Sequence, residues 1–386
     1  MQASTQGTPT NGHNGTIFVA IELSQRSWLV TMHSPARDRI SRHKLEGGDH
    51  AGLLKLIEEA RERAERKLGS RPEVVSCYEA GYDGFWLHRL LTQAGISNFV
   101  FDPASIPVEQ RARRAKTDRI DGELMLRTLM AYQRGEPRVV RIVRVPSVAQ
   151  EDARRASREH GRLITEQTAH INRIKALLRL LGLPVGKPQR RDWLAFIAQQ
   201  RDWRGAAIPP GLLAEVTREH ARLMLVRDQL EALQQARAAT PACAEAAEMA
   251  KRRDLLRQVK GIGPVFAATL TDEVFYKDFR NRREVAAYFG LAPTPWCSGR
   301  MDREQGIGKS GNPRARHKAI EMAWLWLRHQ SDSALARWFK ERTANAGKLA
   351  KRIAIVALAR KLIVALWRYL TTGLVPEGAL LKAVKA

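Results

Sequence analysis

The first third of the chain alternates short apolar runs with turn-forming residues. Runs rich in β-branched residues, with the period of two that is typical of strands, cover 16–23, 27–32 and about 39–45. A helical spacing of leucines and isoleucines follows over about 50–68. The pattern then predicts a strand over 73–78, a helix over 85–93, a strand near Phe99 and a further helix.

This order of elements bears on the class of fold. Three consecutive strands before the first helix are expected of an α/β ribonuclease-H-like sheet, whereas a doubly wound sheet alternates strands with helices. We therefore expect a ribonuclease-H-like domain over 16–147. Residues 1–15 are polar and lack the basic start and apolar core of a signal peptide, so we expect a disordered leader there.

Strand signals vanish between about 148 and 250, where apolar residues recur in steps of three, four and seven. A first run contains Ile164, Ile171, Ile174, Leu178 and Leu181, and after several prolines a second contains Val216, Leu223, Val226, Leu230 and Leu233. Such spacing is typical of a coiled coil, so we expect two long antiparallel helices over 148–250. The stripe suits a helical core within one chain and a dimer contact equally well, and both remain open.

The remainder, 251–386, is expected to be a mainly helical domain with glycine-rich turns, ending in a basic amphipathic helix over about 348–370. Its longest late apolar stretch, 353–359, is followed at once by Arg360 and Lys361, so no membrane span is expected. Three cysteines lack the paired spacing of a zinc site. These features predict a cytoplasmic protein.

The net charge of the chain indicates the class of its binding partner. The 386 residues include 65 Lys and Arg against 40 Asp and Glu, a formal net charge of +25 at pH 7. An excess of this size is expected to attract a polyanion, and nucleic acid is the partner that it favours.

Four acids are candidates for a metal site. Glu22 lies on the face of the first strand opposite to Ile17, Val19 and Ile21, and Glu79 ends the fourth strand. Asp118 and Asp121 are three residues apart at the start of an apolar helix, which places them on one helical face. Converging carboxylates supply the hard oxygen ligands that magnesium prefers. Taken singly, each acid could equally be a helix cap or a surface charge.

The C-terminal part carries two glycine-containing motifs. Val259-Lys260-Gly261-Ile262-Gly263-Pro264 predicts a helix-hairpin-helix-like turn, whose glycines would let backbone N–H groups approach a phosphate, although such turns also simply join two helices. The stretch 306–312 resembles a nucleotide phosphate loop, but Arg303 stands where that motif needs glycine, so ATP binding is rejected. The residues expected to contact nucleic acid are Lys116, Lys260, Gly261, Gly263, Arg300, Lys309, Asn312, Arg314, Arg316 and Lys318.

The segment Glu79-Ala80-Gly81, the block from Lys116 to Asp121 and the C-terminal motifs together resemble the DEDD insertion-sequence transposases, whose relatives include pilin-gene inverting recombinases. The resemblance covers nearly the whole chain. It implies a RuvC-like catalytic domain, with Glu22, Glu79, Asp118 and Asp121 holding magnesium or manganese. Glu22 departs from the aspartate of the family and adds one methylene.

The resemblance further implies that Ser298, in Cys297-Ser298-Gly299, is a nucleophile that takes a cut DNA end covalently. It implies a bacterial, nucleoid-associated enzyme that is guided by a structured noncoding bridge RNA. It also implies a dimer or tetramer, because the two halves of one active site come from different subunits. Two alternatives remain open: a metal-dependent junction endonuclease that uses water, and a non-catalytic nucleic-acid-binding relic.

Overall fold

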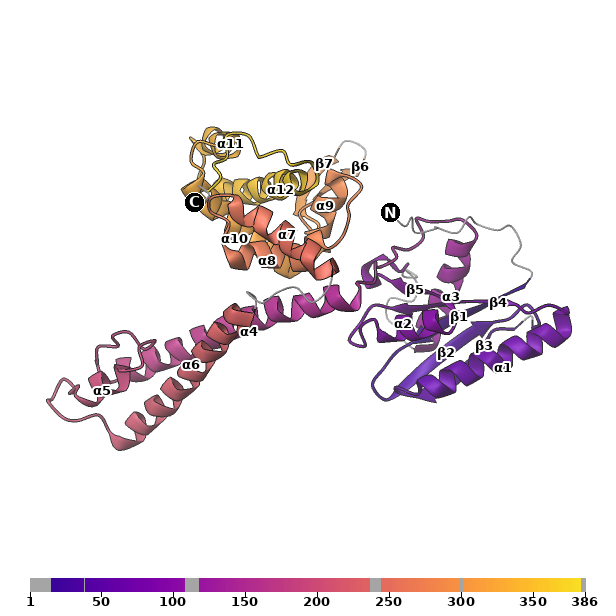
Figure 1. The fold of residues 1–386 in the computed structure, drawn as a ribbon, viewed down its shortest axis with the longest axis horizontal. Coiled ribbons are helices and arrows are strands. Elements are labelled where there is room, and N and C mark those ends of the chain that lie inside the picture. The colour runs from indigo at the N-terminus through magenta and orange to yellow at the C-terminus, as the bar shows by residue number, and fades with distance from the viewer. Residues whose placement is uncertain (1–14, 38, 108–117, 237–243, 299–300, 383–386) are drawn as a thin grey trace. The chain divides into compact units, whose positions relative to one another are not determined.

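The computed structural model describes residues 15–37, 39–107, 118–236, 244–298 and 301–382. The chain divides into two compact units, Met1–Val145 and Pro146–Ala386, and each is described by itself (Figure 1). The elements of the first unit are β1 (Thr16–Glu22), β2 (Ser27–His33), β3 (Ser41–Glu46), α1 (His50–Leu68), β4 (Glu73–Glu79), α2 (Trp86–Gln93), β5 (Ser97–Phe101) and α3 (Asp118–Gln133).

The first unit is a five-stranded mixed sheet in the order β3-β2-β1-β4-β5. Strand β2 pairs antiparallel with both β1 and β3, whereas β4 pairs parallel with β1 and with β5. The mixed α/β class and the order of elements predicted from the sequence are confirmed.

Helices cover both faces of this sheet, which explains why β1 is apolar on both sides. Ile17, Val19 and Ile21 pack in one cluster with residues of α1 and α2. Phe18 and Ala20 point to the other face and pack in a second cluster with residues of α3. Because successive side chains of a strand alternate between faces, the end of β1 presents its next side chain toward the α3 side.

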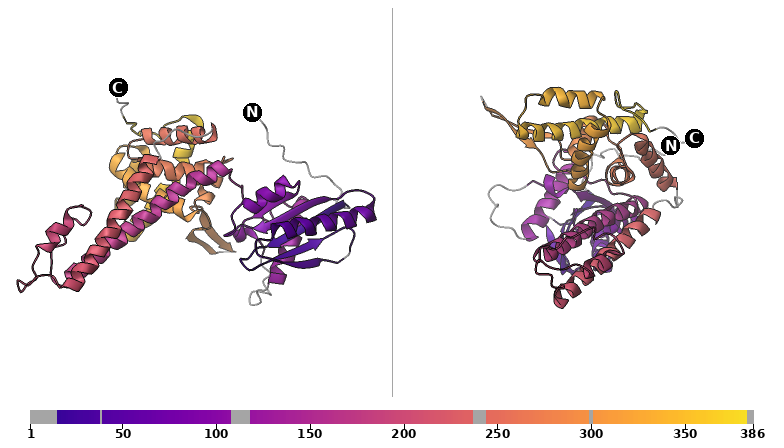
Figure 2. Two further views of the ribbon diagram at one scale, coloured as in Figure 1. Left: turned by 60° about the horizontal axis from the view of Figure 1, so that its bottom comes forward. Right: turned by 90° about the vertical axis from the view of Figure 1, so that its left-hand side faces the viewer.

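The second unit begins with an antiparallel pair of long helices, α4 (Val148–Arg179) and α6 (Pro210–Ala236) (Figure 2). The short helix α5 (Trp193–Ala198) lies in the chain segment that connects them. Arg173 pairs with Glu215 at 2.6 Å and His170 with Glu219 at 2.7 Å, so numbers fall along α4 as they rise along α6. The predicted pairing is confirmed, and here the apolar stripe is used within one chain.

One position of the predicted seam is wrong. Ile164 is 42% exposed, and the neighbouring Leu163 is buried in its place against Val226 and Leu230 of α6. The buried stripe of α4 is therefore shifted by one residue at this level, where α4 still packs against α6. Farther along, Ile174 and Leu178 are fully buried, as the spacing predicts.

The rest of the second unit is mainly helical, with one cluster of buried apolar side chains. Its elements are α7 (Ala244–Gln258), α8 (Pro264–Leu270), a π-helical turn (Thr271–Phe275), α9 (Arg282–Tyr288), β6 (Pro293–Ser298), β7 (Met301–Ile307), α10 (Pro313–His329), α11 (Ala334–Thr343) and α12 (Lys348–Thr372). The antiparallel hairpin β6-β7 was not expected from the sequence. Within the described residues, no helix is long and apolar enough to cross a membrane.

Candidate active site and nucleic-acid interface

Two of the predicted acids lie side by side at one end of the sheet. The parallel pairing of β1 with β4 runs as far as Ile21 opposite Tyr78, and the next residues are Glu22 and Glu79. Both follow the alternation that places Ala20 and Cys77 on the α3 face. Glu22 is half-buried and Glu79 is exposed. The sheet therefore carries two carboxylates on one face, at the carboxyl ends of adjacent strands.

The first turn of α3 reaches the same end of the sheet, because Gly122 has no side chain. A Cβ at this glycine would lie 2.6 Å from Thr31 Oγ1 and 3.8 Å from Leu29 Cδ2. Leu29 is the β2 residue opposite Glu22. Asp121 directly precedes the glycine and is half-buried. Two of the four predicted acids thus share one edge of one face, and the helix turn that carries Asp121 packs on the same face.

A closed metal site is not formed by the side chains that the structure describes. Among them, no group of three His, Cys, Asp or Glu residues lies close enough to hold a metal ion. Asp118 begins α3, but its side chain is outside the described part. The nearby Glu123 is instead paired with Arg42 across to β3. The four-acid site stays a prediction.

The predicted nucleophile ends a strand. Ser298 is the last residue of β6, and its Cα is paired with that of Met301, the first residue of β7. It therefore lies at the turn of the β6-β7 hairpin. Its side chain is not among those described, and Lys116 and Arg300 lie wholly outside the described residues.

The glycine-containing turn between α7 and α8 has a structural explanation. Gly261 has a φ of +91°, in the left-handed region, and a Cβ there would lie 2.9 Å from Cβ of His329. The backbone of Lys260 is held on both sides: its N–H donates to Leu380 O, and its carbonyl accepts from Gln330 Nε2. The predicted turn joins two helices, α7 and α8, with Gly263 at the N-cap of α8 and the side chain of Lys260 exposed. Contact with phosphate stays a prediction.

Several of the predicted nucleic-acid contacts are occupied within the chain. Arg316 donates to the carbonyl oxygens of Phe289 and Lys309, and Lys318 pairs with Glu321 at 2.7 Å. Lys309 is exposed and adopts a left-handed φ of 56°. Of these three cations, only Lys309 extends from the loop without such an internal contact among the described residues.

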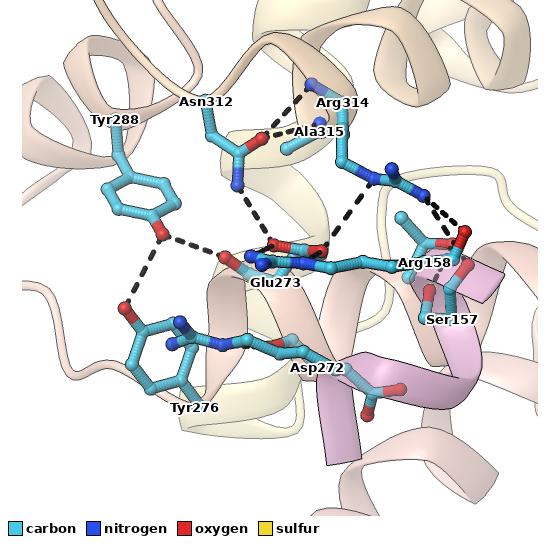
Figure 3. A network of polar contacts seen from close by, with 11 residues as sticks. Ser157, Arg158, Asp272, Glu273, Tyr276, Tyr288, Asn312, Arg314 and Ala315 are labelled. Atoms are coloured by element: carbon cyan, nitrogen blue, oxygen red, sulfur yellow. Dashed lines mark hydrogen bonds and ion pairs between the residues drawn. The ribbon is translucent and has the colours of Figure 1, made fainter. Parts of the chain in front are cut away.

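A buried carboxylate that no sequence pattern indicated organises the same region (Figure 3). Glu273, in the π-helical turn, has a side chain that is 1% exposed. Arg158 of α4 binds it in a bidentate manner, with Nε–Oε1 at 2.8 Å and Nη2–Oε2 at 3.1 Å. Asn312 donates from Nδ2 to Oε2 at 3.3 Å, and Arg314 lies 3.8 Å from Oε1. Such pairing offsets the cost of burying the charge.

The carboxylate network also fixes the start of α10. Asn312 is the N-cap of that helix and accepts from the backbone N–H groups of Arg314 and Ala315. Arg314 donates to the carbonyl oxygens of Ser157 and Arg158, so it ties α10 to α4. Asn312 and Arg314, both expected to contact nucleic acid, thus have structural partners. Because α10 follows β7 closely, this junction positions the hairpin that carries Ser298.

The electrostatics agree with a charged Glu273. Burial raises the pKa of its carboxyl, but the hydrogen bonds and charge of Arg158 outweigh this and hold the pKa below its ordinary value. Tyr288 donates to the Glu273 backbone carbonyl at 2.8 Å, and burial raises the pKa of its phenol. The guanidinium carbon of Arg154 lies 4.0 Å from the centre of the Tyr276 ring, a cation–π contact.

Comparison with known proteins identifies similar chains. The model of the IS116/IS110/IS902 transposase family matches residues 253–338. A putative transposase, y4rJ, of Sinorhizobium fredii is 48% identical over 376 residues, which cover 95% of both chains. The transposase for insertion sequence element IS1111A of Coxiella burnetii is 28% identical over 60% of this chain and 62% of its own. A probable family 20 transposase of Pseudomonas aeruginosa is 28% identical over 60% of this chain and 67% of its own.

Proposed function

The chain belongs to the IS116/IS110/IS902 family of transposases, and on this basis we propose that it cuts and rejoins the DNA strands of an insertion sequence through a covalent phosphoserine at Ser298. In the cleavage step the Ser298 hydroxyl oxygen forms a bond to the scissile phosphorus, and the bond from phosphorus to one deoxyribose oxygen breaks. The serine gives up its proton and the leaving oxygen gains one. Because water is not consumed, the energy of the broken phosphodiester bond is kept in the phosphoserine bond and is available for rejoining.

The observation that carries this proposal is the set of acids at one edge of the sheet. Glu22 and Glu79 end the adjacent strands β1 and β4 on one face, and Asp121 lies in the first turn of α3, the helix that covers that face. Oxygen-only donors of this kind suit magnesium or manganese. A bound metal ion would supply Lewis-acid polarisation of the scissile phosphate. The strand order β3-β2-β1-β4-β5 supports a ribonuclease-H-like, RuvC-like assignment for this domain.

Two further parts of the proposal concern partners. The net charge of +25 suits two polyanions, the DNA and a structured noncoding guide RNA. The acids lie in the first unit and Ser298 in the second. We assign the chain to a homo-oligomer in which one subunit supplies the acids and another the serine of each active site.

The proposal is tested by mapping the covalent product. Purified protein is incubated with magnesium, the noncoding RNA that flanks its gene, and donor and target DNA, and the products are then denatured. We expect a DNA adduct that survives denaturation, and mass spectrometry of nuclease- and protease-treated adduct is expected to locate the phosphate on Ser298. Cleavage without any adduct would favour a water-using endonuclease, which needs only the acids of the first unit.

Glu79→Gln separates metal-dependent chemistry from DNA binding. Because Glu79 is exposed, the isosteric amide is expected to leave folding unchanged. The loss of one oxygen ligand is expected to lower magnesium-dependent cleavage by about 100-fold, roughly 2.7 kcal/mol of activation free energy. DNA affinity measured without metal should not fall. Glu73→Gln, at the exposed opposite end of β4, is the matched control, and equal cleavage by wild type and Glu79→Gln would contradict the assignment.

A further inference from the structure

A groove of about 760 Å³ opens on the second unit and is lined by residues of α9, α11, α12 and the segment after α12. We call it the cationic groove. Its positively charged side chains are Arg282, Arg283, Arg360, Lys361 and Arg368. Glu377 is the one acid among its lining residues, so the cations exceed the acids by four (5 − 1).

The cations of α12 form a face that the core does not use. Arg360, Val364 and Arg368 recur in steps of four, and Lys361 precedes Val364 by three, so the four residues lie on one side of the helix. The buried positions Leu358, Leu362 and Leu366 belong to the cluster on the other side. Packing of the core therefore accounts for Leu358, Leu362 and Leu366, whereas Arg360 and Arg368 are not part of the core cluster.

The charges of the groove are also not neutralised within the chain. Among the described residues, no ion pair is formed by Arg282, Arg283, Arg360 or Arg368, whereas the arginines around Glu273 are paired with it. Lys361 lies 4.7 Å from the centre of the Trp338 ring, a contact that leaves its positive charge in place. Repulsion among clustered cations favours an anionic occupant.

The apolar part of the lining restricts the form of that occupant. Leu374 and Val375 follow α12, line the groove together with the arginines and are 68% and 39% exposed. Val364 also lines the groove, but it is half-buried and packs against the core cluster. Duplex DNA presents its phosphates but keeps the faces of its bases stacked. An unpaired strand presents both phosphates and base faces, so its phosphates can pair with the cations while a base contacts the exposed aliphatic side chains.

We propose that the cationic groove binds an unpaired strand of DNA, with phosphates on Arg360 and Arg368 and a base against Leu374 and Val375. The proposal rests on the proposed function only in taking DNA as the polyanion. In a transposase such a site would hold a strand that has been separated from its complement. It needs neither the acids nor Ser298, so its failure would leave the mechanism of cleavage untouched.

Fluorescence anisotropy of the full-length protein without metal ions tests the groove. The probes are a labelled single-stranded 12-mer of DNA, its duplex and the RNA strand of the same sequence. Arg360→Gln/Arg368→Gln is expected to weaken single-strand binding about tenfold and to lower the slope of log K against log salt by about 1.4, the value for two lost phosphate contacts. The control Lys351→Gln/Arg352→Gln removes two exposed cations from α12 outside the groove, and is expected to lower single-strand affinity less than threefold.

The apolar contact has its own variant and readout. Leu374→Ser, at an exposed position, is expected to weaken single-strand binding about threefold with an unchanged salt slope. Crosslinking of bromodeoxyuridine-labelled strand is expected within 357–377. Equal losses in the groove and control variants, an equal loss of duplex binding, or crosslinks confined to other segments would overturn the proposal. If the wild-type protein bound the RNA strand at least tenfold more tightly than the DNA strand of the same sequence, that result by itself would overturn the choice of DNA.

Discussion

Alanine in place of Ser298 is expected to abolish the denaturation-resistant protein–DNA product and to lower strand transfer by at least about 1,000-fold, or roughly 4 kcal/mol of activation free energy. Alanine lacks the hydroxyl oxygen that forms the bond to phosphorus, so the variant cannot form the covalent intermediate. Ser298 ends β6 at the turn of a two-stranded hairpin, and alanine is compatible with an extended backbone there. The measurement is denaturing electrophoresis of labelled DNA, with strand transfer followed in parallel.

Ser331→Ala is the matched control for that substitution. Ser331 is exposed, lies between α10 and α11, and donates only to its neighbour Asp332 among the hydrogen bonds described. We expect wild-type levels of adduct and product from this variant. An adduct of undiminished yield in Ser298→Ala would assign the covalent link to another residue, and would end the phosphoserine proposal.

Glu273→Gln is expected to lower the free energy of unfolding of the second unit by about 2–4 kcal/mol. Removing one partner of a buried ion pair costs about 3–5 kcal/mol. We expect a smaller loss in the free energy of unfolding here because Arg158 is 52% exposed and regains some hydration. Three elements would loosen together, since Glu273 joins α4, the π-helical turn and the start of α10. Urea unfolding, combined with hydrogen exchange at the amides of α10, measures the loss.

The effect should depend on pH in a defined direction. The folded-state pKa of Glu273 lies below its ordinary value of 4.5, so the carboxylate contributes stability above pH 4.5. That contribution is lost as pH falls through the folded pKa, and the difference between wild type and Glu273→Gln should therefore shrink in acid. Glu248→Gln, which breaks a surface pair with Arg252 at 3.4 Å, should cost at most about 1 kcal/mol. A loss of the same size in both variants would contradict the role given to burial.

The fold of the first unit could be predicted closely from the sequence because its signals are local. The period of two in β1 and the turn residues after it depend on neighbours in the chain, and the strand from 73 ends at Glu79, one residue beyond the predicted 78. The hairpin β6-β7 was missed because its residues, including two prolines and Arg303, lack a clear apolar alternation. Tertiary contacts, rather than local preference, decide such a segment.

In the candidate sites, too, some features follow from local sequence and others depend on tertiary contacts. Glu22 and Glu79 could be placed together from strand order, because adjacent parallel strands end at the same edge. The pairing of Arg158 with Glu273 could not, since 115 residues separate them and neither lies in a recognisable motif. For Asn312 and Arg314 the residue types suggested phosphate contacts, but internal carboxyl and carbonyl partners satisfy them equally well.

The antiparallel pairing of α4 with α6 limits how this protein can change length during evolution. An insertion in one helix alone would shift every later apolar residue out of the shared seam, and would leave the opposite helix too short to cover it. Insertions are expected to be tolerated as matched pairs, seven residues in each helix, each pair extending the hairpin by about 10 Å. Variation in length among homologous hairpins should therefore be stepwise rather than continuous, while the loop around α5 between the two helices is free to vary residue by residue.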